Sequence, residues 1–369
     1  MIAHKVFVTQ ILRTLGIFNG KKAFSAPETV QIILINNCNL NCVVCPIHSD
    51  HLKQKKELKW KQKKQDFETI KKVISELSEI GVKEILLNAD GEPFLYNQLK
   101  KLIIHIKLKG LKCNIITNGT LLNKKKIEEL QKLKLDRLIV SLWAGDAKTY
   151  SDIHPEQTGK TFTKIKECLL QLKELKRTNR IPQLSISNTI FNKNYENISQ
   201  MIKFAEEIDS DYVEFRIAGL LHELRKFELS KHQKETILIS LKKINKNKPT
   251  IKNNLQEFQK AISFSLNGSH RMDRGIPNKI PCYAGWYYSK IDVDGNVHPC
   301  INCNNPMGNI KNTSFKKIWH SKEYNKFRKL AKQKYKGSYF KNYLCNQHCC
   351  LYIKNLSIYK KLNPFKKQL

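Results

Sequence analysis

The sequence predicts an α/β protein with a parallel sheet, followed by a smaller cysteine-rich segment. Six short apolar runs of β-type composition alternate with amphipathic stretches of helical length, which is typical of βαβ units. The expected strands cover 30–35, 84–87, 113–117, 137–142, 184–190 and 212–217, and the expected helices cover 66–80, 97–109, 123–133, 160–177 and 195–208. Right-handed units of this kind form either an open doubly wound sheet or a partial α/β barrel.

Length and composition favour a globular protein with a large core. The chain has 369 residues, 41% of them hydrophobic, so it needs no disulfide bonds to fold. No apolar run approaches the roughly 20 residues that span a bilayer. The formal net charge is +34, and the excess is almost entirely lysine. Recognition of nucleic acid usually depends on the forked guanidinium groups of arginine, so an excess of lysine favours a solvated surface instead. A lysine-rich surface would still attract an acidic partner.

Residues 1–27 form the first expected unit of the chain. Phe7, Ile11 and Leu15 recur at helical spacing, while Gln10 and Arg13 interrupt the apolar run that a signal peptide would need. We expect an amphipathic helix that docks onto the main domain, and contact with a membrane surface is the weaker alternative. Without an export signal, we expect the protein in the cytoplasm.

The cysteines carry the strongest functional signal. Short spacings in a chain without an export signal indicate metal or redox chemistry rather than a disulfide framework. Cys113 and Cys168 stand alone and are expected to be packed thiols. The other nine form an early group, Cys38, Cys42 and Cys45, and a late group, Cys282, Cys300, Cys303, Cys345, Cys349 and Cys350.

Polar residues follow the predicted strands at the ends where α/β proteins bind ligands. Asp90-Gly91 and Asn118-Gly119 are residue pairs that commonly form turns and helix caps, so their presence after strands needs no ligand. Turns and caps do not account for three cysteines within eight positions. In chain order the strand-end residues are the early cysteine group, Asp90-Gly91-Glu92-Pro93, Thr117-Asn118-Gly119, Ser141 with Trp143, Asn188, and Arg216.

Two motifs stand in order along the chain: Cys38-x3-Cys42-x2-Cys45 follows the first strand, and Asp90-Gly91-Glu92-Pro93 follows the second. With these motifs, about residues 28–220 of the chain resemble the radical S-adenosylmethionine (SAM) superfamily. The resemblance implies a partial (β/α)6 TIM-like barrel. Three thiolates on one loop can hold three irons of a 4Fe–4S cluster and leave the fourth open. In the family, SAM binds that iron and is reductively cleaved to a 5′-deoxyadenosyl radical. Val44 departs from the aromatic residue common before the third cysteine.

The resemblance also implies roles for individual residues. Asp90, Gly91, Glu92 and Pro93 would present acceptors to the SAM ammonium group, which can only donate. Asn118, Ser141 and Asn188 complete the expected cofactor-binding set, for which cap or turn roles are the alternative. Arg216 is the candidate catalytic contact to substrate, with a structural ion pair as the alternative.

The C-terminal portion, residues 277–352, resembles the SPASM/twitch extension of these enzymes and implies one auxiliary 4Fe–4S cluster. A β-hairpin is expected to turn at Asp294-Gly295 within a segment that starts at Gly285. Cys282 and Cys300 are the firmest expected ligands, Cys345 and either Cys349 or Cys350 would complete the set, Cys303 is a rival, and a structural zinc is the alternative. A helical linker, 221–276, precedes this domain, with helices near 230–245 and 252–264, and a solvated basic tail, 353–369, follows it.

These features predict a radical SAM oxidoreductase that abstracts a hydrogen atom from a small polar, carbohydrate-like substrate and passes an electron to the auxiliary cluster. Reduced ferredoxin or flavodoxin is the expected electron donor. The cluster loop begins at Cys38, which leaves no room for a leader-binding domain and so favours a small molecule over the alternative, a peptide maturase. A basic, zinc-stabilised nucleic-acid-binding protein is the alternative of another class.

Overall fold

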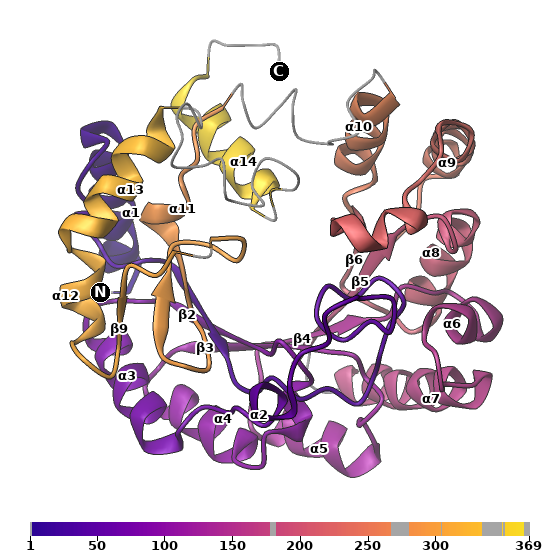
Figure 1. The fold of residues 1–369 in the computed structure, drawn as a ribbon, viewed down its shortest axis with the longest axis horizontal. Coiled ribbons are helices and arrows are strands. Elements are labelled where there is room, and N and C mark those ends of the chain that lie inside the picture. The colour runs from indigo at the N-terminus through magenta and orange to yellow at the C-terminus, as the bar shows by residue number, and fades with distance from the viewer. Residues whose placement is uncertain are drawn as a thin grey trace.

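The computed structural model describes residues 2–177, 182–266, 280–303, 305–333, 349 and 351–364. A curved sheet forms the inner layer, and helices cover its outer face (Figure 1). The sheet contains nine strands in the order β6-β5-β4-β3-β2-β1-β7-β8-β9. Because β1 to β6 are adjacent in chain order and all parallel, they form a partial barrel rather than a doubly wound sheet. The expected partial (β/α)6 barrel is therefore confirmed.

The six barrel strands lie close to their predicted positions. They are β1 (Thr29–Ile33), β2 (Glu84–Asn88), β3 (Lys112–Thr117), β4 (Arg137–Ser141), β5 (Gln183–Ile190) and β6 (Tyr212–Ile217). The C-terminal strands are β7 (Tyr288–Ile291), β8 (Asn296–His298) and β9 (Gly308–Asn309).

The helices follow the amphipathic pattern, and several begin at a side-chain cap such as Asp66, Asn123 or Asp146. The α-helices are α1 (Ile2–Asn19), α2 (Leu58–Lys61), α3 (Phe67–Glu79), α4 (Leu99–Leu108), α5 (Lys124–Lys132), α6 (Ala147–Ile153), α7 (Gly159–Lys176), α8 (Ile198–Glu207), α9 (Lys231–Lys246), α10 (Leu255–Leu266), α11 (Ala284–Tyr287), α12 (Phe315–Trp319), α13 (Lys322–Lys332) and α14 (Tyr352–Leu362). Three short 3-10 helices are η1 (Pro93–Leu95), η2 (Tyr195–Asn197) and η3 (His222–Phe227).

The inner face of the barrel is polar, although the strands read as apolar runs. Glu84 on β2 accepts hydrogen bonds from the Thr29 hydroxyl on β1 (2.5 Å) and from the Asn114 amide on β3 (3.2 Å). Ile85 and Leu87, which alternate with Glu84 along β2, are completely buried. On β2, Ile85 and Leu87 therefore pack in the core, whereas Glu84 faces the barrel interior, where it meets Thr29 and Asn114.

The C-terminal segment continues the barrel sheet, because β7 pairs in parallel with β1. The indole of Trp286 donates to the Lys22 carbonyl (3.0 Å), and that of Trp319 donates to the Ser25 carbonyl (2.9 Å). Arg328 is completely buried and donates to the carbonyls of Gly285 (2.7 Å) and Trp319 (2.8 Å). The two cysteine groups are thus carried on one continuous framework.

Two sequence expectations are corrected in this segment. The hairpin turns at Gly295 as expected, with φ at +87°, but residues 285–287 belong to α11 and not to its first strand. The tail beyond 352 is not simply solvated, because it contains α14. Asn355 and Tyr359 of α14 are buried, since they lie one helical turn apart on the side that packs against the core.

Glu76 on α3 joins the barrel to the C-terminal domain. Its carboxylate accepts hydrogen bonds from the backbone N–H groups of Phe315 (3.1 Å) and Lys316 (2.8 Å) in the first turn of α12. An anion at a helix N-terminus satisfies donors that the helix itself leaves unpaired.

We expect Glu76→Gln to lower the free energy of unfolding by about 1 kcal/mol, because a neutral amide cannot accept both N–H bonds equally well. Urea titration of the unliganded protein measures this change. Glu79→Gln, at an exposed position on the same helix, is the matched control and should leave the midpoint almost unchanged. Equal effects of the two substitutions would contradict the role of Glu76.

Candidate active site

The early cysteines lie on a tight loop that follows β1 at the carboxyl edge of the barrel. The N–H of Cys45 donates to the Cys42 carbonyl (2.9 Å), and the N–H of His48 donates to the Cys45 sulfur (3.3 Å). The Ser49 hydroxyl closes the loop by donating to the Val43 carbonyl (2.8 Å). This folding brings the three thiols together as electrostatic neighbours.

The thiols of this loop are poor acids by themselves. Burial raises the pKa of Cys38 to about 11 and also raises the pKa values of Cys42 and Cys45. Thiolate ligands must lose their protons, and a bound metal centre supplies the positive charge that stabilises them. Within the described residues, no group of three or more His, Cys, Asp or Glu side chains converges on one ion position. Three neighbouring thiols on one loop can supply three ligands of a 4Fe–4S cluster, which leaves its fourth iron without a protein ligand.

The Asp90-Gly91-Glu92-Pro93 segment packs directly against the cysteine loop. The N–H of Glu92 donates to the Asn37 carbonyl (2.8 Å), and the His48 ring donates to the Asp90 carbonyl (2.7 Å). A Cβ atom on Gly91 would lie 1.7 Å from the Asn37 oxygen. Only glycine permits this approach, so Gly91 has a steric role in addition to its expected role in cofactor binding.

Glu92 connects the ends of two strands. Its buried carboxylate accepts from the Thr117 hydroxyl (2.7 Å), the Phe94 N–H (3.1 Å) and the Asn118 N–H (2.8 Å). Burial raises the pKa of Glu92, and these hydrogen bonds oppose the shift. The predicted contact of Glu92 with the SAM ammonium stays a prediction, while its bracing of β2 against β3 is a structural role that the motif did not indicate. Pro93 is buried at the start of η1.

Asn118 also braces the cysteine loop. Its amide donates to the Asn39 side chain (3.0 Å), and Asn39 in turn donates to the Thr120 hydroxyl (2.8 Å). The Asn118 side-chain oxygen accepts from the N–H (3.0 Å) and hydroxyl (2.7 Å) of Thr120. Its expected cofactor contact is therefore accompanied by a network that fixes the loop carrying Cys38.

Strand register separates Ser141 from Asn188. Ser141 pairs with Ser187 of β5, whereas Asn188 shares its face of β5 with the buried Ile186 and Ile190. Both amide atoms of Asn188 are buried without a hydrogen-bond partner in the described part of the chain. A bound polar group would relieve that cost, but the alternation places Ser187 next to Ser141. Counting alternate residues along β5 was the signal that could have found Ser187.

Arg216 forms the ion pair that was the alternative to its catalytic role. Its guanidinium lies 2.7 Å from a carboxylate oxygen of Glu214, two residues earlier on β6. In the register of the sheet, Glu214 lies opposite Ser187 and Arg216 lies opposite Thr189. Substrate contact by Arg216 stays a prediction, and Glu214 joins it as an unpredicted polar residue of the same face.

An aromatic wall stands beside the cysteine loop. Trp143 has a positive φ of 63° after β4, and its ring centroid lies 6.0 Å from that of His154. The rings of Tyr150 and His154 are 4.2 Å apart, and burial lowers the pKa of His154 to about 4, so this imidazole is neutral at pH 7. The Val43 N–H donates to the Ile153 carbonyl (3.1 Å). Helix α6 thereby supports the early cysteine loop, although the spacing of apolar residues in the sequence did not predict this helix.

The late cysteines also gather, although Cys345 and Cys350 lie outside the described residues. Cys282, Cys300 and Cys303 are buried, and the Tyr287 phenol is an electrostatic neighbour of Cys282, Cys300 and Cys349. The Cys303 thiol donates to the Asn305 carbonyl (3.2 Å).

Asn355 of α14 touches two of these cysteines. Its amide nitrogen lies 3.9 Å from the Cys282 sulfur and 3.8 Å from the Cys349 sulfur. Its oxygen accepts from the Tyr283 N–H (2.9 Å), which orients the amide. No sequence signal marked Asn355, because it lies in a segment that composition assigned to a basic tail.

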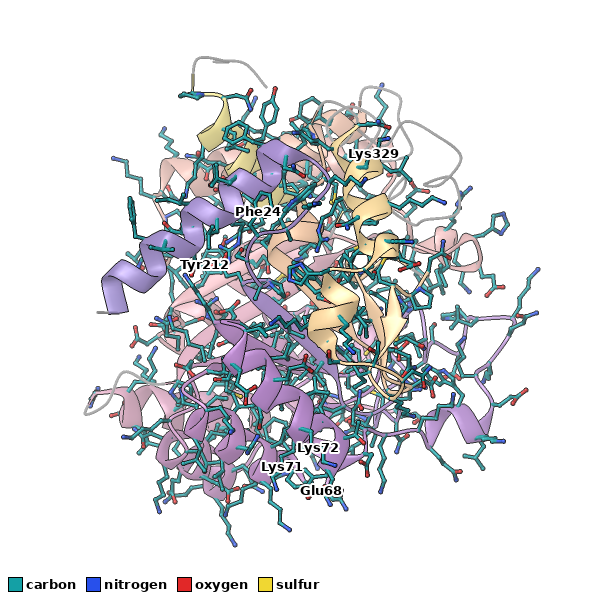
Figure 2. The ribbon with its side chains drawn as sticks, turned by 90° about the vertical axis from the view of Figure 1, so that its left-hand side faces the viewer. Phe24, Glu68, Lys71, Lys72, Tyr212 and Lys329 are labelled. Carbon is teal, nitrogen blue, oxygen red and sulfur yellow. The ribbon has the colours of Figure 1, made fainter. Side chains whose placement is uncertain are left out.

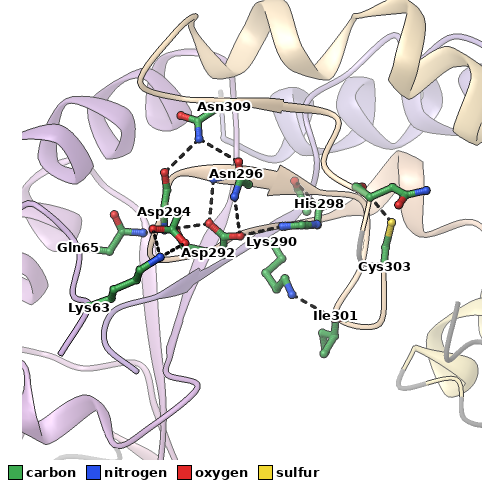
Figure 3. A network of polar contacts seen from close by, with 12 residues as sticks. Lys63, Gln65, Lys290, Asp292, Asp294, Asn296, His298, Ile301, Cys303 and Asn309 are labelled. Carbon is green, nitrogen blue, oxygen red and sulfur yellow. Dashed lines mark hydrogen bonds and ion pairs between the residues drawn. The ribbon is translucent and has the colours of Figure 1, made fainter. Parts of the chain in front are cut away.

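A polar network holds the hairpin formed by β7 and β8 (Figure 3). Asp292 accepts from the backbone of Asp294 (3.0 Å) and from the His298 ring (3.0 Å). Lys63 binds both carboxylate oxygens of Asp294 (2.9 Å each), and Gln65 donates to the Asp292 carbonyl (2.6 Å). The Lys63 carbonyl accepts from the Asn36 N–H, and the Gln65 N–H donates to the Leu34 carbonyl, just before the early cysteine loop. This network therefore joins the two cysteine regions.

The site combines a partial barrel, three neighbouring thiols at its carboxyl edge, and a second cysteine group carried by the extension of the same sheet. This arrangement is typical of iron–sulfur enzymes. Comparison with protein families agrees. Residues 32–208 match the Radical SAM superfamily, and residues 282–350 match the SPASM domain, an iron–sulfur cluster-binding domain. The chain therefore belongs to the radical SAM superfamily and carries a C-terminal SPASM domain. It is an enzyme whose cofactors are SAM and 4Fe–4S clusters.

Similar sequences and structures extend over most of the chain. An AdoMet-dependent heme synthase of Methanosarcina barkeri is 27% identical, covering 83% of this chain and 85% of the relative. A PqqA peptide cyclase of Rhodopseudomonas palustris is 24% identical, covering 83% and 77%. Among solved structures, Streptococcus suis SuiB bound to S-adenosylmethionine is 16% identical with a TM-score of 0.63, covering 88% of this chain and 72% of SuiB. The described part of the chain contains no helix long and apolar enough to cross a membrane.

We expect Gly91→Ala to displace the early cysteine loop and to lower the iron bound after anaerobic reconstitution by roughly half, because the Cβ atom would overlap the Asn37 carbonyl. Iron analysis and visible absorption measure the loss, and circular dichroism reports whether the fold survives. Gly159→Ala is the control, since its Cβ would meet only Ala147, at 3.1 Å from the Ala147 Cβ. Full iron content in Gly91→Ala would disprove the steric role.

Proposed function

We propose that this enzyme is a peptide-modifying radical SAM oxidoreductase. The observation that carries the proposal is the similarity, over 83% of this chain, to a PqqA peptide cyclase, whose named substrate is a peptide. Glu214 and Arg216, which form an ion pair on β6, would meet polar groups of such a substrate.

The preference for a carbohydrate-like substrate is not supported by these relatives. Neither of them is named for a sugar, and the expectation depended on where the chain begins. The heme synthase relative favours a second candidate, a redox modification of a tetrapyrrole or a related small molecule. Trp143, the half-buried member of the aromatic wall, would offer its ring to such a molecule, so this candidate is tested alongside the peptide.

The chain's own residues have separable tasks in the reaction. Cys38, Cys42 and Cys45 would hold the SAM-binding cluster, which supplies a 5′-deoxyadenosyl radical when SAM is bound and an electron arrives. Gly91 and Glu92 fix the loop, so the thiols need little rearrangement when they bind metal. The buried aromatic wall excludes water beside the loop, while Glu214 and Arg216 offer paired charges to polar groups of a substrate.

For the auxiliary cluster we propose Cys282, Cys300 and Cys349 as ligands, with Cys345 as the fourth and Cys303 as its rival. Support comes from the gathering of the first three around Tyr287. The contact of Asn355 with both the Cys282 and the Cys349 sulfur supports Cys349 as a ligand of the same cluster as Cys282. An amide N–H directed at a thiolate stabilises its negative charge, so Asn355 would be a positioning residue for two ligands.

The electron donor would dock beside the early cysteine loop. A cavity of about 320 Å³ is lined by Cys38 and by Lys55, Lys56 and Lys61. Its lining also contains Asp50, which pairs with Lys55 at 2.9 Å, and Glu156, so the lysines exceed the acidic residues by one. Lysines around a cavity that reaches a cluster ligand would attract an acidic redox protein such as ferredoxin or flavodoxin, and added salt should weaken that attraction.

We expect Asn355→Leu to reduce the iron content by up to half and to move the midpoint potential of the remaining auxiliary cluster to more negative values, because it removes a donor from two sulfurs. Iron analysis and redox titration followed by electron paramagnetic resonance measure both effects. Asn363→Leu, at the end of the same helix, is the matched control, because its amide donates only to the Tyr359 carbonyl. An unchanged potential and iron content in Asn355→Leu would exclude the positioning role.

The proposed function is tested with anaerobically reconstituted enzyme, SAM and reduced flavodoxin. We expect 5′-deoxyadenosine formation to rise with a peptide encoded beside the gene, together with a peptide product that is lighter by two hydrogens. Mass spectrometry measures both products, and Cys42→Ala, which removes one ligand of the SAM-binding cluster, is the inactive control. The same dehydrogenation of a porphyrin precursor but not of the peptide would replace the proposal with the second candidate.

A further inference from the structure

The outer face of α1 carries an exposed apolar stripe. Five large apolar side chains follow one another at spacings of one to four residues, and each is between 38% and 62% exposed. They are Phe7, Val8, Ile11, Leu15 and Phe18. Phe24, just beyond the helix on the same side of the molecule, is 44% exposed (Figure 2). Contiguous exposed apolar side chains of this kind mark an interaction surface.

The exposure of the stripe is a consequence of how the opposite face is docked. Ile17 is buried, and Arg13 forms an ion pair with Glu28 at 3.3 Å. Gly16 packs so tightly that a Cβ atom there would lie 3.1 Å from the Trp286 ring. Lys332 of α13 donates to the Phe18 carbonyl (2.7 Å) at the end of the helix. These contacts hold α1 on the periphery of the molecule (Figure 1), and they leave the stripe exposed.

The residues around the stripe are positively charged, which favours an anionic partner. Residues 1–27 contain no Asp or Glu, and the exposed Lys21 and Lys22 follow the helix directly. Two copies of a chain with net charge +34 repel each other, so a second copy is disfavoured as the occupant. A single helix that projects aromatic side chains from a peripheral position, flanked by lysine, suits the boundary between lipid headgroups and acyl chains.

We propose that the stripe of α1 docks the enzyme on an anionic lipid bilayer. The apolar side chains would enter the interface, while Lys21 and Lys22 would contact the headgroups. This contact is interfacial, since no helix in the described part of the chain could cross a bilayer. It goes beyond the proposed function and does not depend on it, because it concerns where the reaction takes place rather than its substrate.

Vesicle sedimentation of the reconstituted enzyme tests the proposal. Wild type should bind phosphatidylcholine vesicles that contain phosphatidylglycerol and should bind pure phosphatidylcholine much more weakly. The double variant Phe7→Ser/Phe18→Ser should lose roughly tenfold or more in partitioning, because it removes two exposed aromatic side chains that would enter the bilayer. Lys21→Glu/Lys22→Glu should weaken binding to the anionic vesicles.

The control is Leu108→Ser/Ile239→Ser, which removes apolar side chains that are 80% and 57% exposed on α4 and α9, away from the stripe. This variant should bind like wild type. Circular dichroism and iron content, which should be equal in all variants, separate loss of binding from loss of fold. Absence of wild-type binding, equal loss in stripe and control variants, or a wild-type dimer in sedimentation velocity that Phe7→Ser/Phe18→Ser abolishes would each overturn the proposal.

Discussion

The close packing of the Asp90-Gly91-Glu92-Pro93 segment against the early cysteine loop is the contact on which the site depends. Gly91 approaches the Asn37 carbonyl at a distance that only glycine allows. Glu92 then holds the ends of β2 and β3 together by accepting hydrogen bonds from Thr117 and Asn118. A loop fixed from both sides presents its thiols before any metal arrives, and such preorganisation reduces the conformational entropy lost on cluster binding.

The second cysteine group is tied to this loop by short, local contacts. β7 extends the barrel sheet, and Lys63 and Gln65 fasten the hairpin of the C-terminal domain next to the early cysteines. Arg328, buried against the rings of Trp319 and Tyr324, and the carboxylate of Glu76 hold the helices behind it. These contacts hold the two cysteine groups in a fixed position relative to each other.

The periphery of the molecule serves other purposes. The lysine-lined cavity beside Cys38 and the apolar stripe of α1 lie on different parts of the surface and differ in chemistry. One suits a transient acidic redox partner, because charge speeds association and is screened by salt. The other suits a lipid interface, because it combines apolar area with a local absence of acidic residues. A positive net charge supports both contacts.

The sequence by itself determined the six βα units, the superfamily and the cysteine loop, because alternation and spacing are properties of neighbouring residues. The tertiary structure alone decided which atoms meet across long separations. It placed Ser187 rather than Asn188 next to Ser141, and it brought Asn355 to Cys282, which lies more than seventy residues away. It also turned a tail that composition marked as solvated into α14. Such contacts follow from strand register and helix packing, which no local pattern encodes.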